Sequence, residues 1–501
     1  MFPRPLSESL RLPWLIKPSK ISSKLKLLAM GVGLLLACLF VGVLSVQYGE
    51  WVGDKLARVV ILPGAIALGF LLLMDKRKLL LLLLPIRAPI DPLLQVTRGG
   101  GLSPGAIMNA LILLIAILLV LERYNKGLRT VVSMWLPLVL IIIYETAFSP
   151  DLLQGVRTCL SYFTYLAVFT AAFYLQQCQK DMRYCINLLL LSSVIPTLYG
   201  FVDFANGGYG GAYGNRVASM FPHPNIFAFY LVLMITLAFY AVKSPIINMS
   251  SGRRKLLVAY IVLMVVNLIL TKTRSAWAAC FLTFVVYGIM FERRYLIYII
   301  VGSVIASMIP EIQDRLSDLN TESSYWNNGL PLNSYDWRKM LWESAWAWMK
   351  PSGIPLGYGI GSFAFHAPDF FRIGEGRNWS AHSVYYQWLF EAGVVGLLCG
   401  AWLYFKLLVL LRAGARFDRL GSVTVISIVV GYLVMCYSDN MLDYLCFNWY
   451  YWFLLGTACS IIVTHRSEEE AGLLAAESAS RRGGAVPSGG TPGLTASSAT
   501  A

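Results

Sequence analysis

Charged side chains are scarce in this sequence, which limits what kind of protein it can be. Asp, Glu, Lys and Arg make up 14% of the 501 residues, and 57% of the residues are apolar. A soluble globular protein carries roughly 25% charged residues, and a helix that crosses a bilayer needs roughly 20 apolar residues in a row. The apolar residues of this chain fall into blocks of about that length. The composition therefore excludes a soluble enzyme with one membrane anchor and predicts a polytopic membrane protein.

Further absences in the sequence limit which bonds, metal sites and partners can be expected. The nine cysteines lie almost entirely in apolar segments and form no CxxC pair, so neither a disulfide framework nor a zinc site is expected. The sequence contains no DxD pair or other carboxylate-rich metal signature. The formal net charge is +14. Binding of nucleic acid would need a basic face on a soluble domain, and the sequence offers no such domain, so nucleic acid is not expected as a partner.

Apolar runs bounded by charges predict fourteen candidate spans. They lie near 28–48, 57–73, 79–96, 105–121, 131–147, 157–176, 184–203, 225–242, 255–271, 275–291, 295–310, 384–411, 421–438 and 444–463. The run at 79–96 holds three prolines together with Arg87 and Asp91, so it could be a broken or partly inserted helix. The expected fold class is an all-α polytopic integral membrane protein with 12 to 14 transmembrane helices and one large external loop containing short helices.

Lys and Arg collect on one side of these spans, which predicts the orientation. Alternating the spans places the basic N-terminal arm and six further basic clusters on the same side, and short basic loops stay cytoplasmic. Both termini are therefore expected in the cytoplasm. The predicted organisation is a cytoplasmic arm at 1–27, a transmembrane region at 28–310, an external loop at 311–383, C-terminal transmembrane helices at 384–463 and a disordered cytoplasmic tail at 464–501.

The external loop contains an amphipathic segment, YDWRKMLWESAWAWMK at 335–350. Helical spacing places Trp337, Leu341, Ala345 and Trp348 on one face. This pattern predicts an interfacial helix that lies on the outer leaflet.

Five polar residues lie at the external ends of predicted spans or in the external loop, and they are the candidate site: Arg216, Arg274, Arg338, His382 and Asp439. Several have a purely structural alternative. Arg274, which lies beside Lys272, could reach the lipid head groups, His382 could be a helix cap, and Asp439 could be an interhelical hydrogen-bond partner.

The other histidines and the glycine-rich strings carry weaker signals. His223 lies between two prolines and is interpreted as a turn residue, whereas His366 and His465 are interpreted as inert. The strings GGYGGAYG at 207–214 and GYGIG at 357–361 are typical of turns whether or not they bind phosphate.

Arginines and one histidine on the same membrane face suit an anion with a leaving group. A guanidinium binds phosphate oxygens bidentately and keeps its charge at physiological pH, and an imidazole can remove a proton from an attacking hydroxyl. A diphosphate leaving group needs charge stabilisation from a metal ion or from cationic side chains. This sequence favours the cationic side chains.

Several strings resemble the O-antigen ligase and O-antigen polymerase superfamily over roughly residues 105–463. They are NRVASMFPHPN, TKTRSAW, DWRKMLWESAWAWMKPSGIPLGYGIGSF and AHSVYYQWLFEAGVVGLL. The family's three arginine positions match Arg216, Arg274 and Arg338, and its histidine matches His382. The Glu-x-Gly that follows that histidine is present as Glu391 and Gly393. The chain departs from the family pattern at Ser383, where Asn is commoner, and at Tyr386, where Leu is usual.

The resemblance implies glycan transfer from undecaprenyl diphosphate to the lipid A-core oligosaccharide at the periplasmic face of the bacterial inner membrane. Arg216, Arg274 and Arg338 would hold the diphosphate, and His382 would be the general base. Asp439 and Lys272 would be supporting residues. The transfer would invert the anomeric centre and need no cofactor or metal. Trp337, Trp342, Trp346 and Trp348 would rest on membrane lipids and frame the access route for lipid-borne substrates.

Three alternatives stay open at this point. An O-antigen polymerase and a protein O-oligosaccharyltransferase need the same donor chemistry. A transporter or flippase of lipid-linked sugars belongs to a different class, and charged residues at the membrane midplane with broken helices in repeated halves would favour it.

Overall fold

A computed structural model describes residues 75–95, 104–122, 127–175, 179–209, 215–308, 334–374 and 376–483, together with Gln313. The spans expected at 28–48 and 57–73 lie outside these residues. Within the described parts, every regular element is a helix, and the only strand-type pairing is an isolated antiparallel bridge between Tyr209 and Arg216. The all-α class is thereby confirmed.

Residues 75–87 form a helix, and the labelled elements follow it. The long helices are α3 (Pro104–Glu122), α4 (Leu128–Ala147), α5 (Leu152–Leu175), α6 (Gln179–Ala205), α7 (Pro224–Lys243), α8 (Ser251–Leu270), α9 (Arg274–Met290), α10 (Arg294–Ser307), α16 (Gly393–Ala413), α17 (Arg419–Ser438) and α18 (Leu445–Gly483). The shorter elements are α2 (Asp91–Gln95), α13 (Ser334–Trp348), η1 (Pro351–Gly353), α14 (Ser362–Phe370), η2 (Arg372–Gly374), α15 (Val384–Glu391), η3 (Gly414–Arg416) and η4 (Met441–Asp443).

Eight of the described helices are long and apolar enough to cross a membrane: α3, α4, α5, α6, α7, α16, α17 and α18. The apolar helices α9 and α10 are shorter, with 17 and 14 residues. A helix satisfies its own backbone hydrogen bonds, which is why apolar runs of this length fold as helices in lipid. The chain is a multi-pass membrane protein, and the total of 12 to 14 spans stays a prediction.

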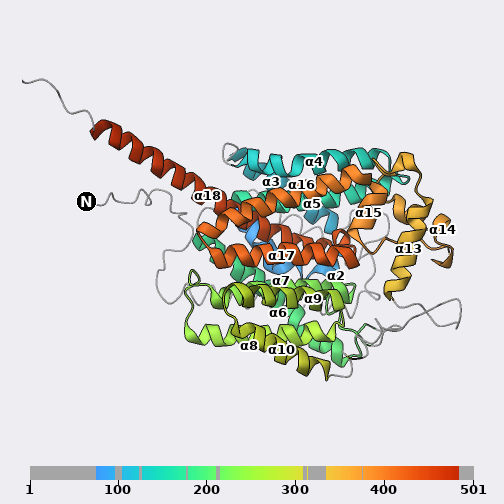
Figure 1. Cartoon of the computed structure of the whole chain (residues 1–501), viewed down its shortest axis with the longest axis horizontal. Helices are drawn as coiled ribbons and strands as arrows, with labels where there is room; N and C mark the ends of the chain where they lie inside the picture. The colour runs from blue at the N-terminus through green and yellow to red at the C-terminus, as the bar shows by residue number, and fades with distance from the viewer. Residues whose placement is uncertain are drawn as a thin grey trace, which may run out of the picture.

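The helices form one bundle in which α7 and α18 are the most enclosed spans. In the apolar stretch of each helix, 89% of the residues are buried in α7 and 83% are buried in α18. α18 packs against α5, α7 packs against α8, and α17 packs against α9. Figure 1 shows α13 and α14 at one end of the bundle, whereas the last part of α18 projects from the other end.

The run at 79–96 is a broken helix, as its prolines indicated. The helix ends at Arg87, a turn follows, and α2 begins at Asp91. A single hydroxyl bridges the break: Tyr450 donates to the carbonyl of Leu84 (2.9 Å) and accepts from the amide of Ala88 (2.8 Å). That carbonyl and that amide would bond to each other in a continuous helix. The buried Arg87 guanidinium pairs with Asp91 one turn later.

The span expected at 384–411 is two helices, α15 and α16, which corrects the sequence interpretation. Ala392 separates them. Gly393, the first residue of α16, has φ at +64°, and a Cβ there would lie 2.4 Å from the carbonyl of Pro355. The amides of Val394 and Val395 donate to the carbonyls of Ile354 (2.9 Å) and Pro355 (3.1 Å). The segment around η1 therefore docks into the break between the two helices.

The tail expected to be disordered from 464 onward is helical as far as Gly483, because α18 continues through it. Ala, Leu and Glu are frequent in AGLLAAES, and these residues have high helix propensity, so an existing helix extends at little cost. Residues 484–501 lie outside the described part of the chain.

Candidate active site

The five candidate residues come from separate elements. Arg216 precedes α7, Arg274 is the first residue of α9, and Asp439 is the C-cap of α17. Arg338 lies in α13, and His382 lies just before α15. Asp439 and Arg338 both act electrostatically on His382, which places these three side chains in one neighbourhood.

Arg216 is held by the α8–α9 turn and by the start of α7. Its Nε donates to the carbonyl of Thr271 (2.8 Å), and one terminal nitrogen donates to Asn225 Oδ1 (2.7 Å) and Thr273 Oγ1 (3.0 Å). Asp203 fixes the loop that follows Arg216 by accepting from two successive backbone amides (2.8 Å each). Arg216 therefore orders the surrounding elements as well as bringing positive charge to the site.

Asp439 is 2% exposed and anchors a second set of contacts. Its carboxylate accepts hydrogen bonds from the Asn225 side-chain amide and from the Tyr444 hydroxyl, and from the amide of Asn440 (2.9 Å). Asn225 thus links Arg216 to Asp439. In the part of the chain that the structure describes, no hydrogen bond joins Asp439 to His382, so the geometry gives Asp439 the role of ordering Asn225 and Tyr444.

His382 has a strained backbone and an imidazole without a hydrogen-bond partner among the described residues. Its φ is +49°, in the left-handed region that a bulky residue rarely adopts. The ring packs edge-on against Trp337, with 5.8 Å between centroids. Burial, together with the positive charge of Arg338, lowers the pKa of His382 to about 4, although Asp439 opposes the shift. The imidazole is therefore neutral near pH 7, as a proton acceptor must be.

Arg338 is the arginine best placed to take a ligand. It lies half-buried in α13, and it forms no hydrogen bond or ion pair within the described ranges. Its charge nonetheless reaches His382, His223 and Tyr444. A guanidinium held there without a protein carboxylate is suited to an anionic ligand.

Arg274 and Lys272 lie in the turn that holds Arg216. Lys272 has φ at +53°, and Arg274 begins α9 directly after the N-cap Thr273. Both side chains are half-buried. The turn therefore adds two cations beside Thr271 and Thr273, which bind Arg216.

His223 lies at a turn, as the sequence predicted, and it also lies near three of the candidate residues, which the sequence did not predict. It is the N-cap of α7, where its Nδ1 accepts from the amide of Asn225 (3.1 Å). The pKa of His223 is raised by Asp439 and lowered by Arg216 and Arg338. The string His-Pro-Asn after a turn was a signal for a helix start, but nothing in the sequence placed it beside His382.

The amphipathic face of α13 packs on protein, so the expectation that it rests on lipid is wrong. Leu341 and Ala345 are buried against Phe363, Phe371 and Phe390, from α14, the residue after it and α15. The loop has its own apolar cluster, and this cluster covers the face. Of the four tryptophans at 337, 342, 346 and 348, only Trp346 is exposed. Trp342 stacks on Tyr386, with 4.2 Å between ring centroids.

His366, which the sequence analysis interpreted as inert, has a carboxylate partner. Its Nδ1 lies 3.0 Å from Asp369 Oδ2, one turn along α14. The GYGIG turn at 357–361 is structural: the Gly359 amide donates to the carbonyl of Glu391 (2.9 Å), and the Ile360 amide donates to that of Glu145 (3.1 Å).

A buried polar chain continues from the site into α15. The Asn440 side-chain amide donates to Gln387 Oε1 and to Asp443 Oδ2 (2.6 Å), and Gln387 Nε2 donates weakly to Glu391 Oε2 (3.4 Å). Burial raises the pKa of Asp443 to about 6 and that of Glu391 to about 8. Glu391 Oε1 has no hydrogen-bond partner among the described residues. Glu391 is therefore a neutral acid at pH 7.

The raised pKa of Glu391 makes a stability prediction. Between its ordinary pKa, near 4.5, and about 8, the unfolded chain has lost this proton and the native state has kept it. The free energy of unfolding therefore falls as pH rises through that range, by an amount on the order of a few kcal/mol. Glu391→Gln should remove this loss and unfold at a higher temperature than the wild type at pH 8. Thermal unfolding in detergent from pH 5 to 8 tests this.

Glu343→Gln is the matched control, because Glu343 is exposed on α13. It should keep the pH dependence of the wild type. A Glu391→Gln variant with that same pH dependence would show that Glu391 is ionised in the native state.

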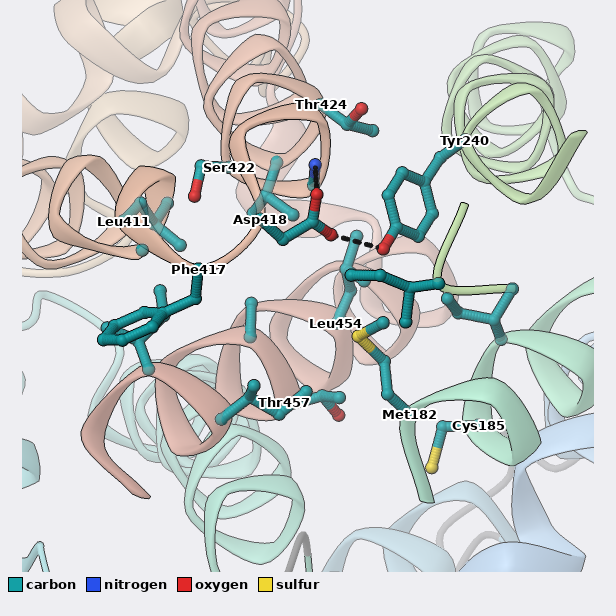
Figure 2. Close-up of a pocket in the computed structure, with 18 of the residues that line it drawn as sticks. Met182, Cys185, Tyr240, Leu411, Phe417, Asp418, Ser422, Thr424, Leu454 and Thr457 are labelled. Atoms are coloured by element: carbon teal, nitrogen blue, oxygen red, sulfur yellow. Dashed lines mark hydrogen bonds between the residues drawn. The ribbon is translucent and has the colours of Figure 1, made fainter. Parts of the chain in front are cut away.

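A cavity of about 80 Å³ lies at the opposite ends of helices that form the site, between α6, α7, α16, α17 and α18 (Figure 2). Its lining is mostly apolar, and Figure 2 shows Asp418 hydrogen-bonded to Tyr240 (2.6 Å) at its wall. None of the five candidate residues lines it. The cavity is therefore separate from the candidate site.

In the described residues, no three His, Cys, Asp or Glu side chains form a group that could hold a metal ion.

Comparison with known proteins gives one family. No curated protein matches the chain. Residues 259–401 match the family described as O-antigen ligase, and this range holds Arg274, Arg338, His382 and Glu391. The similarity to this family covers less than half of the chain.

Proposed function

We propose that the protein is an O-antigen ligase, a glycosyltransferase that moves O-antigen polysaccharide from undecaprenyl diphosphate to the lipid A-core oligosaccharide. The observation that carries the proposal is the position of Arg338, a cation with no protein acceptor in the described residues, next to the neutral imidazole of His382. An anion site beside a base is what transfer from a diphosphate donor requires.

In the proposed reaction His382 accepts the proton of the acceptor hydroxyl. The hydroxyl oxygen then attacks the anomeric carbon, and the bond from that carbon to the phosphate oxygen breaks. The configuration inverts, and undecaprenyl diphosphate leaves with the bonding electron pair. Arg338 and Arg274 stabilise its charge, and Arg216 adds charge while it orders the α8–α9 turn. These groups supply the charge stabilisation without a metal ion or cofactor.

The proposed location is the bacterial inner membrane, with the site facing the periplasm and both termini in the cytoplasm. The basic clusters support this, since they fall on the side opposite to α13 when the spans alternate. The donor and the acceptor are both lipid-anchored, so they reach the site along the membrane.

The test offers the purified protein an undecaprenyl diphosphate-linked glycan with one acceptor at a time. The ligase produces a ladder on lipid A-core. Extension of a second carrier-linked glycan would identify an O-antigen polymerase, and transfer to a protein hydroxyl would identify a protein O-oligosaccharyltransferase. Translocation of the intact donor across a vesicle without transfer would identify a flippase and overturn the proposal.

The lowered pKa of His382 predicts the pH profile. The profile of kcat/KM reports groups of the free enzyme, so its acid limb should fall near pH 4 and not near the ordinary imidazole value. A bound diphosphate neutralises the positive charge of Arg338 and should raise the pKa of His382, so the acid limb of kcat should lie at higher pH than that of kcat/KM. Initial rates from about pH 3 to pH 8 measure both limbs. A kcat/KM limb near 6.5 would contradict a buried, cation-flanked base.

A further inference from the structure

His223 has a fixed protonation pattern, because one of its ring nitrogens is already used. Nδ1 accepts a hydrogen bond from the Asn225 amide (3.1 Å), so Nδ1 must carry its lone pair. In a neutral imidazole the hydrogen is then on Nε2. The backbone N–H of Asn225 therefore selects the tautomer of His223 that has its hydrogen on Nε2.

The surroundings of His223 also keep the ring neutral. Burial lowers its pKa, and the positive charges of Arg216 and Arg338 act in the same direction, whereas Asp439 opposes them. The groups that face the ring from α13, α17 and the loop before α7 are these three residues. Protonation would in addition destroy the Nδ1 cap of α7. His223 is thus a hydrogen-bond donor that cannot act as a base.

The donor at Nε2 has no protein acceptor among the described residues, and the side chain is only half-buried. The ring stands edge-on to Tyr209, with 5.7 Å between centroids. It lies close enough to His382 and Arg338 to interact with both electrostatically. An N–H fixed in one tautomer therefore lies within electrostatic reach of the proposed base and of Arg338.

We propose that His223 is a substrate-binding residue whose Nε2–H donates to an anionic oxygen of the donor's diphosphate. This inference rests on the proposed function. A phosphate oxygen only accepts hydrogen bonds, which suits a group that can only donate, and its charge strengthens the bond. The two histidines then differ in role: His382 accepts a proton during transfer, whereas His223 holds the leaving group.

Two substitutions separate this role from helix capping, because each keeps one half of the imidazole. In His223→Asn, the side-chain oxygen can replace Nδ1 as the cap, but nothing replaces the Nε2 donor. In His223→Gln, the side-chain amide can reach the position of Nε2 and donate, but the cap is lost. His366→Asn is the matched control, since His366 lies in α14 against Trp348, outside the site.

The experiment measures binding of undecaprenyl diphosphate to the full chain in detergent, together with thermal unfolding and the KM and kcat of transfer. His223→Asn should bind about 10- to 100-fold more weakly, as for a lost hydrogen bond to a charged group, with a higher KM and an unchanged unfolding temperature. His223→Gln should bind nearly as tightly as the wild type and unfold at a lower temperature. His366→Asn should bind as the wild type does.

Wild-type affinity in His223→Asn, or an equal loss of affinity in both His223 variants, would overturn the inference while leaving the ligase proposal in place. A wild-type protein that binds no undecaprenyl diphosphate would overturn the proposed function and this inference with it.

Discussion

Replacing His382 by alanine is expected to lower kcat for glycan transfer by about 10²- to 10⁴-fold while donor binding stays near the wild-type value. The imidazole is neutral, close to Arg338 and without a hydrogen-bond partner in the described part of the chain, so it can accept the hydroxyl proton. No other described side chain at the site has these properties, since the tautomer of His223 prevents it from acting as a base. Transfer per folded molecule and donor binding on one preparation give the result.

The left-handed backbone at His382 requires a second variant. With φ at +49°, alanine is strained there, so His382→Ala could lose activity by destabilising the turn before α15. Asparagine tolerates this conformation better and offers no base of comparable strength, so His382→Asn should fold normally and be nearly as inactive. Wild-type turnover per folded molecule in either variant would remove His382 as the general base.

Arg338→Lys is the second substitution with a large expected effect, a loss of about 10- to 100-fold in kcat/KM although the charge is kept. A guanidinium can bind two phosphate oxygens at once, and an ammonium cannot reproduce this geometry. Transfer assays over a range of donor concentrations measure the loss.

Arg372→Lys provides the control, because Arg372 is exposed in the segment after α14 and is outside the site. It should keep its activity. Equal activities of the two lysine variants would show that Arg338 supplies only charge.

The sequence predicted most of the long helices in the described part of the chain, and it grouped three candidate residues that lie close together in the structure. Apolar runs near the length of a bilayer fold as helices for reasons local to each run, and this predicted α3 to α7 closely. Placing polar residues at span ends predicted that Arg338, His382 and Asp439 would meet, since alternation of spans fixes the side on which each end lies. These inferences needed no knowledge of which helices are neighbours.

The features that could not be predicted from the sequence depend on tertiary contacts. Asn225 joins Arg216 to Asp439 across α7 and α17, and no local pattern marks it. The apolar face of α13 fits a membrane surface as well as it fits Phe363 and Phe390, and only packing decides between them. The break before Gly393 likewise depends on the docking of Ile354 and Pro355, which are distant in the chain.

In the proposed reaction, arginines and a histidine catalyse transfer from a lipid diphosphate. The most direct measurement follows a donor labelled in both its glycan and its phosphates, incubated with the purified protein and lipid A-core in excess EDTA. We expect one undecaprenyl diphosphate to be released for each glycan joined to the core, with an inverted anomeric linkage and no change on adding Mg²⁺ or Mn²⁺. Activity that disappears in EDTA and returns with either ion, or a donor that stays intact with active protein, would contradict it.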